Sequence, residues 1–212
     1  MLENMKGAIF DLDGVIVDTA KYHYLAWASL ADELGFKFTE EDNERLKGVS
    51  RMRSLDILLE VGGLEFKEAE KLAMAEKKNR LYVEYISRLE ESELLPGVKE
   101  YLTGLRSRGI GIALGSASKN AEFILNKLNI TDLFDAVVDG NKVSLAKPDP
   151  EVFLIAAQEI GLQPDECVVF EDAEAGVQAG KAAGMKVVGI GKPEVLKEAD
   201  LVVKGLYELL TD

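Results

Sequence analysis

The chain has 212 residues, 47% of them hydrophobic and 30% charged, which allows one large or two small globular domains with a substantial core. Its formal net charge of −13 repels nucleic acid and anionic membranes, so we expect neither as a partner. The single cysteine, Cys167, excludes an internal disulfide and is expected to be a buried structural thiol. No apolar run approaches the length of a membrane span, and the N-terminal stretch is too short and too acidic for a signal peptide. We therefore expect a cytoplasmic protein.

Short apolar runs, rich in Val and Ile and bounded by Gly, Asp or Pro, predict buried parallel strands. Helical patterns separate the later runs, and this alternation predicts a doubly wound, Rossmann-like α/β sheet with right-handed crossovers. The predicted strands are 7–10, 110–114, 136–138, 167–170, 186–190 and 201–203, and the predicted helices are 97–108, 119–128, 148–161, 174–183 and 205–210.

One segment, from about Thr19 to Leu89, lacks any convincing strand pattern and contains only amphipathic helical patterns. It follows the first strand and ends at the turn signal LLPG. The sequence therefore predicts a small all-α cap domain, residues 18–89, inserted into an α/β core domain formed by residues 1–17 and 90–212.

Acids, hydroxyls and a lysine follow several of the predicted strands, and ligands of an open α/β sheet bind beyond the carboxyl ends of its strands. Asp11 and Asp13 follow the first predicted strand, and Ser116 lies in a Gly-Ser-Ala-Ser stretch after the second. Glu171 and Asp172 follow the predicted strand 167–170. Lys147 precedes the helix predicted at 148. We expect all of these side chains to converge on one crevice.

This set of residues suits phosphoryl transfer. Several carboxylates in one place repel one another, and a hard divalent cation such as Mg²⁺ relieves that repulsion. Asp11 is a suitable nucleophile, and Asp13 is placed to act as general acid and base. Ser116 and the backbone amides near Ser118 would bind phosphate oxygens, and Lys147 would add a fixed positive charge.

Each of these features also has an ordinary structural interpretation. An Asp-x-Asp pair is common in solvated turns, and Ser-Ala-Ser before a helix is commonly an N-cap. Lys147 could be a surface lysine before a helix that opens with Pro148, and Glu171 with Asp172 could serve the dipole of the next helix. Their joint occurrence at successive strand ends favours the functional interpretation.

The same motifs resemble the haloacid dehalogenase-like superfamily over nearly the whole chain: DLDGV (11–15), GSAS (115–118), Lys147 in AKPDP, and FEDA (170–173). The resemblance implies that Asp11 is the nucleophile and Asp13 the general acid and base. It also implies a single Mg²⁺ ion per chain, held by Asp11, the backbone carbonyl of Asp13, Glu171 and Asp172. The acid at Asp13 argues against a dehalogenase within the superfamily.

Further blocks resemble the β-phosphoglucomutase family within this superfamily: Thr19 and His23 in DTAKYH, Trp27, LKGVSR (46–51), Ser54, KKNRLY (77–82) and SASKN (116–120). The resemblance implies a mutase for sugar phosphates, with β-glucose 1,6-bisphosphate as activator and intermediate. Such an enzyme needs a second anion site, on the cap, to hold the distal phosphate. The residues expected there are Lys47, Gly48, Val49, Ser50, Arg51 and Ser54, with Ala117, Ser118, Lys119 and Asn120 contacting the same ligand from the core domain.

The resemblance further implies catalytic roles for Thr19, His23 and Lys78. His23 would help to position or release the proton of Asp13, and Lys78 would assist His23 in this task. A lone histidine on an amphipathic helix is more often a packed or surface residue, and KGVSR could be a plain turn between helices. Trp27 belongs with the substrate-binding residues by resemblance, although packing in the cap core is the more ordinary role for it and for Tyr22.

We consider three hypotheses for the function of this protein. The first is a Mg²⁺-dependent mutase that interconverts β-glucose 1-phosphate and glucose 6-phosphate through an aspartyl-phosphate enzyme. The second is a sugar-phosphate phosphatase of the same superfamily, and the third is a non-catalytic sugar-phosphate binding protein. Intact Asp11 and Asp13 disfavour the third, because a binder needs no nucleophile. The expected partners are small sugar phosphates, and the resemblance favours a monomer.

Overall fold

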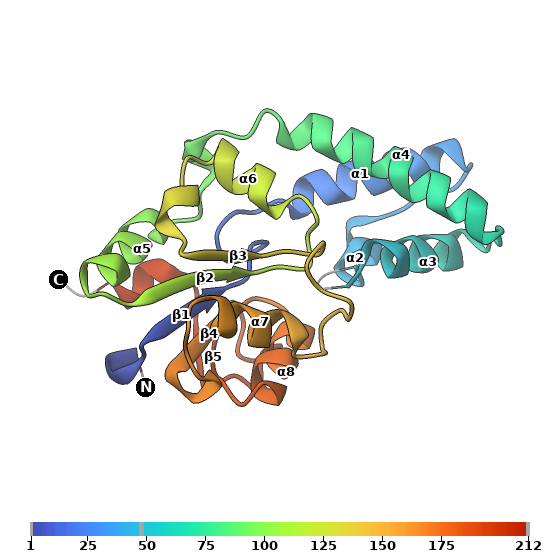
Figure 1. Cartoon of the computed structure of the whole chain (residues 1–212). Helices are drawn as coiled ribbons and strands as arrows, with labels where there is room; N and C mark the ends of the chain where they lie inside the picture. Colours follow the sequence, from blue (N-terminus) through green and yellow to red (C-terminus); the bar gives the residue numbers. More distant parts are fainter. Residues whose placement is uncertain (1, 47–48, 211–212) are drawn as a thin grey trace. The chain divides into compact units, whose positions relative to one another are not determined.

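A single parallel sheet organises most of the chain in the computed structural model, which describes residues 2–46 and 49–210. The sheet has the strand order β3-β2-β1-β4-β5-β6, and every neighbouring pair is parallel. Strands β1 to β5 are labelled in Figure 1. The predicted fold class, a doubly wound α/β sheet, is therefore confirmed. The strands are β1 (Gly7–Phe10), β2 (Gly111–Gly115), β3 (Ala136–Val138), β4 (Cys167–Glu171), β5 (Lys186–Ile190) and β6 (Leu201–Val203).

The chain forms two compact units. The sheet unit comprises Met1–Asp18 and Glu90–Asp212, and the helical unit comprises Thr19–Leu89. The role of the helical unit as a cap stays a prediction.

Helices cover both faces of the sheet unit. On one face, Phe10 of β1 stacks on Phe170 of β4 at 4.5 Å between ring centroids, and Tyr101 of α5 (Val98–Ser107) meets both rings edge-on. Burial raises the pKa of Tyr101 to about 12. On the other face, a buried apolar cluster joins the strands to α7 (Glu151–Glu159) and α8 (Glu174–Ala182). The continuous apolar runs in the strands thus reflect burial on two faces.

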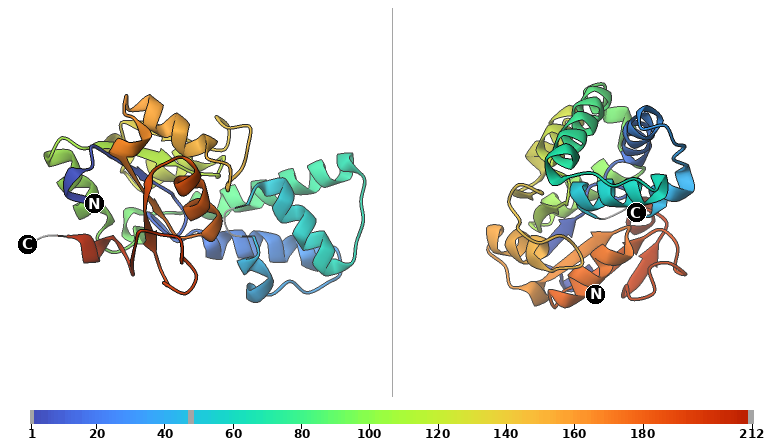
Figure 2. Two further views of the ribbon diagram at one scale, coloured as in Figure 1. Left: turned by 90° about the horizontal axis from the view of Figure 1, so that it is seen from below. Right: turned by 90° about the vertical axis from the view of Figure 1, so that its right-hand side faces the viewer.

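The helical unit contains α1 (Ala20–Glu33), α2 (Glu40–Glu44), α3 (Arg51–Gly62) and α4 (Glu68–Ile86). Helices α1 and α4 lie side by side, and both contact α3 (Figure 2). Their facing sides form a separate core around Trp27, Leu30, Leu55 and Leu58. No helix in the described residues is both long and apolar enough to cross a membrane.

Two helices begin two or three residues later than the sequence predicts, whereas α5 begins one residue later, at Val98. Helix α6 (Ala121–Lys127) begins two residues later than predicted. Helix α7 begins at Glu151 rather than at 148, because the Glu151 carboxylate accepts hydrogen bonds from the amides of Ser144 (2.8 Å) and Leu145 (2.6 Å). These bonds fold the preceding segment into a loop.

Two further expectations concern Cys167 and the C-terminal segment. Cys167 is buried, and burial raises the pKa of its thiol to about 11, as expected of a structural thiol. The helix predicted at 205–210 is instead a short 3₁₀ helix, η5 (Leu206–Leu209).

The aromatic stack of the sheet unit leads to a stability prediction. Phe10→Ala should lower the free energy of unfolding by about 3–5 kcal/mol, because a fully buried ring leaves a cavity. Phe123→Ala, in α6, is the matched control because that ring is 38% exposed, and its loss should be much smaller. Urea unfolding of both variants measures the difference, and equal losses would contradict the packing described.

Candidate active site

The carboxyl ends of the strands lie along one edge of the sheet because all the strands are parallel. Asp11 directly follows β1, Ser116 follows β2, and Glu171 is the last residue of β4. Strands β1 and β4 are neighbours at the point where the strand order reverses, which is where open α/β sheets bind ligands.

Lys147 joins three of these strand ends. Its ammonium donates to Asp11 Oδ1 at 2.6 Å, to Glu171 Oε1 at 2.6 Å and to the carbonyl oxygen of Gly115 at 3.1 Å. The lysine side chain is only 2% exposed. The structure therefore brings together Lys147, Asp11 and Glu171, as the sequence predicts.

Burial and charge both act on these groups. Burial raises the pKa of Asp11 to about 6; Lys147 opposes this shift and the charge of Glu171 adds to it. Burial lowers the pKa of Lys147, but the charges of Asp11 and Glu171 outweigh it and raise that pKa above its usual value. At pH 7 the nucleophile candidate is ionised and the lysine is charged.

Three carboxylates could hold a metal ion. Asp11, Glu171 and Asp172 each offer an oxygen, and these oxygens lie within 4.8 Å of one another. Set against the one ammonium of Lys147, they leave an excess of negative charge, and oxygen ligands of this kind suit hard divalent cations. The Asp13 carboxylate is not in this group among the described residues; the role of its backbone carbonyl stays a prediction.

Two glycines make room for the carboxylates. Gly14 has a φ of 79°, and a Cβ there would lie 2.2 Å from Asp172 Oδ2. Gly176, in the first turn of α8, would place a Cβ 1.8 Å from Glu171 Oε1. The interpretation of the sequence missed Gly176. The only signal for this role in the sequence is a glycine shortly after FEDA (170–173). A glycine in a helix does not by itself indicate contact with a carboxylate.

The segment after β2 presents two hydroxyl groups. Ser116 Oγ accepts a hydrogen bond from the Ser118 amide at 3.1 Å, and Ser118 Oγ accepts from the Asn120 amide at 3.3 Å. A hydroxyl that accepts from an amide keeps its own proton for donation. Ser116 is buried and Lys119 is exposed. Together with Ala117 and Asn120 these residues form one loop, which ends where α6 begins at Ala121.

Within the helical unit, His23 and Lys78 are partners. Lys78 Nζ lies 2.7 Å from His23 Nδ1 and also lies over the rings of Trp27 and Tyr82, at 4.5 and 4.7 Å from their centroids. The His23 ring stacks on Tyr82. Burial, followed by the charges of Lys78 and Arg51, holds the pKa of His23 well below its usual range. The imidazole is therefore neutral at pH 7 and accepts from the ammonium through Nδ1.

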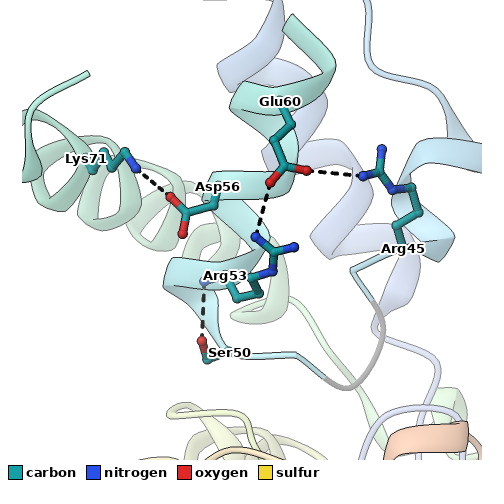
Figure 3. Close-up of polar contacts among 6 residues, drawn as sticks. All are labelled: Arg45, Ser50, Arg53, Asp56, Glu60 and Lys71. Carbon is teal, nitrogen blue, oxygen red and sulfur yellow. Dashed lines mark hydrogen bonds and ion pairs between the residues drawn. The ribbon is translucent and has the colours of Figure 1, made fainter. Parts of the chain in front are cut away.

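The segment predicted to bind a distal phosphate leads into α3. Ser50 caps this helix by accepting from the Arg53 amide at 3.3 Å, as Figure 3 shows. Glu60 of α3 accepts from Arg53 Nη1 of the same helix at 3.1 Å and from Arg45 Nη2, at the end of α2, at 3.3 Å (Figure 3). One carboxylate therefore contacts an arginine on each side of residues 46–51. Arg51 is half-buried, and burial lowers the pKa of its guanidinium.

The other predicted residues of the helical unit are placed as follows. Lys47 and Gly48 lie outside the described residues. Trp27 is 2% exposed in the core of the unit, Val49 packs against this core, and Ser54 is buried. Thr19 is buried at the N-cap of α1, and its backbone carbonyl accepts from the His23 amide at 3.0 Å. Their roles toward a ligand stay predictions.

Comparison with known proteins agrees with these motifs. The profile of the haloacid dehalogenase-like hydrolase family matches residues 5–184. The chain belongs to this family. The resemblance inferred from the sequence is thereby confirmed.

Relatives within the haloacid dehalogenase-like family include mutases and phosphatases. The chain is 47% identical over 207 residues to a β-phosphoglucomutase of Bacillus subtilis, covering 97% of this chain and 92% of that protein. It is 35% identical to a phosphorylated carbohydrates phosphatase of Thermotoga maritima, covering 86% and 83% of the two chains. The crystal structure of a β-phosphoglucomutase from Clostridium difficile superposes with a TM-score of 0.93 at 46% identity, over 97% and 93% of the chains.

Gly176→Ala should weaken metal binding. The added methyl displaces the Glu171 carboxylate, a proposed metal ligand that also pairs with Lys147, so we expect divalent-cation affinity to fall by about 10–100-fold. Calorimetric titration with Mg²⁺ or Mn²⁺ measures this. Gly104→Ala is the matched control, because a Cβ at that helical position meets nothing within 4 Å. Equal affinity in the two variants would contradict the arrangement.

Lys78→Met should raise the pKa of His23 toward its usual value. The substitution removes a positive charge that disfavours protonation and keeps the bulk that desolvates the ring. His23 is the only histidine, so its imidazole proton resonances report the titration directly by NMR. Lys77→Met is the control, because Lys77 pairs with Glu33 on the surface instead. An unchanged titration in Lys78→Met would refute the described pair.

Proposed function

We propose that this enzyme is a β-phosphoglucomutase, which interconverts β-glucose 1-phosphate and glucose 6-phosphate. The observation that carries the proposal is the 47% identity to a protein of that name across 97% of this chain. The convergence of Asp11, Lys147 and Glu171 at the sheet edge supports it, because phosphoryl transfer needs a nucleophile and fixed charges in one place.

The donor set fits a single Mg²⁺ ion. Asp11, Glu171 and Asp172 provide only oxygen atoms and an excess of negative charge, and the backbone carbonyl of Asp13 is the further ligand we propose. When bound, the ion supplies positive charge that neutralises the transferring phosphoryl group.

The first half of the reaction begins with Asp11 carrying a phosphoryl group as an aspartyl phosphate. The 6-hydroxyl of β-glucose 1-phosphate attacks the phosphorus and gives its proton to Asp13. The bond between the phosphorus and the Asp11 oxygen breaks, which leaves a carboxylate. The product is β-glucose 1,6-bisphosphate, which we propose as the intermediate and, when added, as the activator.

The second half uses the same groups on the other phosphate. With the bisphosphate bound in the reverse sense, an Asp11 oxygen attacks the phosphorus at the 1-position. The bond from phosphorus to the sugar oxygen breaks, and Asp13 returns its proton to that oxygen. Glucose 6-phosphate leaves and Asp11 is phosphorylated again, so atoms and charge balance over the cycle.

Binding groups complete the proposal. Ser116 donates its hydroxyl proton to the transferring phosphate and Ser118 contacts the sugar phosphate from the same loop, while Lys147 keeps Asp11 in place. A bisphosphate also needs a site for the phosphate that is not reacting. We assign that site to Ser50 and Arg51, whose planar guanidinium suits phosphate. The monomeric state expected from the sequence stays a prediction.

A product assay tests the function. The protein is incubated with Mg²⁺, a trace of β-glucose 1,6-bisphosphate and either anomer of glucose 1-phosphate, and glucose 6-phosphate and free phosphate are measured separately. We expect glucose 6-phosphate from the β anomer as the main product. Free phosphate as the main product would overturn the mutase and favour the phosphatase.

Asp11→Asn should reduce turnover by about 10³-fold or more, because the amide removes the nucleophilic oxygen while preserving the shape of the side chain. Asp132→Asn, an exposed acid in the 3₁₀ helix η3 (Thr131–Leu133), is the control. Circular dichroism confirms that both variants fold. Full activity in Asp11→Asn would refute the assignment of the nucleophile.

A further inference from the structure

The end of the edge strand β3 and the turn after it, residues 138–141, lie against the loop that follows β2, residues 116–120. The Ser116 amide donates to the Val138 carbonyl at 2.9 Å, and the Gly140 amide donates to the Ser118 carbonyl at 3.2 Å. We call these segments the β3 turn and the substrate loop. None of the groups assigned to phosphoryl transfer comes from the β3 turn, although it contains a buried acid, Asp139.

Asp139 acts on the substrate loop through Asn141. Asp139 Oδ1 accepts from the Asn141 backbone amide at 2.9 Å, and Oδ2 accepts from Asn141 Nδ2 at 2.9 Å. The same Nδ2 group donates its other proton to the carbonyl of Lys119 at 3.1 Å. Both protons of the side-chain amide are therefore used, one to orient the amide and one to hold the loop.

Gly140 brings the two backbones close together. A Cβ at this position would lie 2.4 Å from the carbonyl oxygen of Ala117. That atom belongs to the backbone and cannot swing aside as the end of a flexible side chain can. The absence of a side chain at Gly140 therefore sets how closely the β3 turn approaches the substrate loop.

These contacts reach residues 116, 117, 118 and 119 in succession. The loop is anchored by β2 at one end and by α6 at the other, and the β3 turn holds the part between them. Lys119 is exposed, so its direction depends on the backbone beneath it. Displacements of about 1 Å in positioning groups cost up to about 100-fold in rate.

We propose that Asp139, Gly140 and Asn141 are positioning residues that fix the substrate loop for the sugar part of the substrate. The proposal rests on the proposed function, in which this loop contacts a sugar phosphate. The Ser116 amide donates its hydrogen bond to Val138, whereas Asn141 holds the Lys119 carbonyl and Gly140 approaches Ala117 and Ser118. Changes at Gly140 and Asn141 should therefore affect sugar recognition more than phosphorylation of Asp11.

The test compares two reactions in Asn141→Ala and Gly140→Ala. One uses β-glucose 1-phosphate with a trace of β-glucose 1,6-bisphosphate to phosphorylate Asp11, followed as consumption of the sugar phosphate. The other uses acetyl phosphate, a small donor without a sugar, followed as phosphorylation of Asp11. We expect the KM for the sugar phosphate to rise by about 10-fold or more, and the acetyl phosphate reaction to stay within about 3-fold of the unmodified protein.

Matched variants separate positioning from general stability. Lys142→Ala changes the next side chain, which pairs with Glu159 and not with the loop, and Gly104→Ala adds a methyl group in open space. Both should leave the KM unchanged. Asn141→Asp keeps the shape but replaces the donating amide with an acceptor facing Asp139, so it should match or exceed the effect of alanine.

Two results would overturn the proposal: an unchanged KM in Asn141→Ala and Gly140→Ala, or a parallel fall of both reactions together with the melting temperature. The second would mean that the turn supports only the fold. Because consumption of the sugar phosphate is followed whether it is isomerised or hydrolysed, the comparison stays valid if the mutase assay fails. The two hypotheses are thus tested separately.

Discussion

The buried ammonium of Lys147 is the interaction on which the site depends. It binds Asp11 beyond β1, Glu171 at the end of β4 and the Gly115 carbonyl at the end of β2, so one side chain ties three neighbouring strands at their carboxyl ends. Carboxylates as buried as these are costly to ionise without a partner. Removing Lys147 would leave two buried carboxylates without this partner, and that penalty couples the nucleophile to the sheet.

Much of this arrangement could be predicted because a parallel sheet leaves few choices. Strands buried on both faces are continuous Val- and Ile-rich runs, so β1, β3, β5 and β6 have the predicted bounds. Strand β2 is shifted by one residue at both ends, and β4 extends one residue further than predicted. Once the strands are parallel, the residues after them must share an edge. Asp11 and Lys147, 136 positions apart, could therefore be placed together from the sequence.

Other features could not be predicted because they depend on contacts between distant segments. Gly176 has the sequence context of any helical glycine, and only the position of the Glu171 carboxylate gives it a role. Asn141 and Gly140 are ordinary turn residues until the backbone of residues 117–119 lies beside them. The late start of α7 has the same origin, because the Glu151 carboxylate binds amides six and seven positions before it.

The charge balance of the site defines how an anionic substrate can bind. An ammonium has three protons, and those of Lys147 are matched by Asp11, Glu171 and the Gly115 carbonyl. A phosphate that bound Lys147 directly would have to replace one of these three groups as hydrogen-bond acceptor. The carboxylates also outnumber the ammonium locally, within a chain of net charge −13. Lys147 is therefore better suited to holding Asp11 and Glu171 than to neutralising phosphate, and that neutralisation falls to the proposed divalent cation.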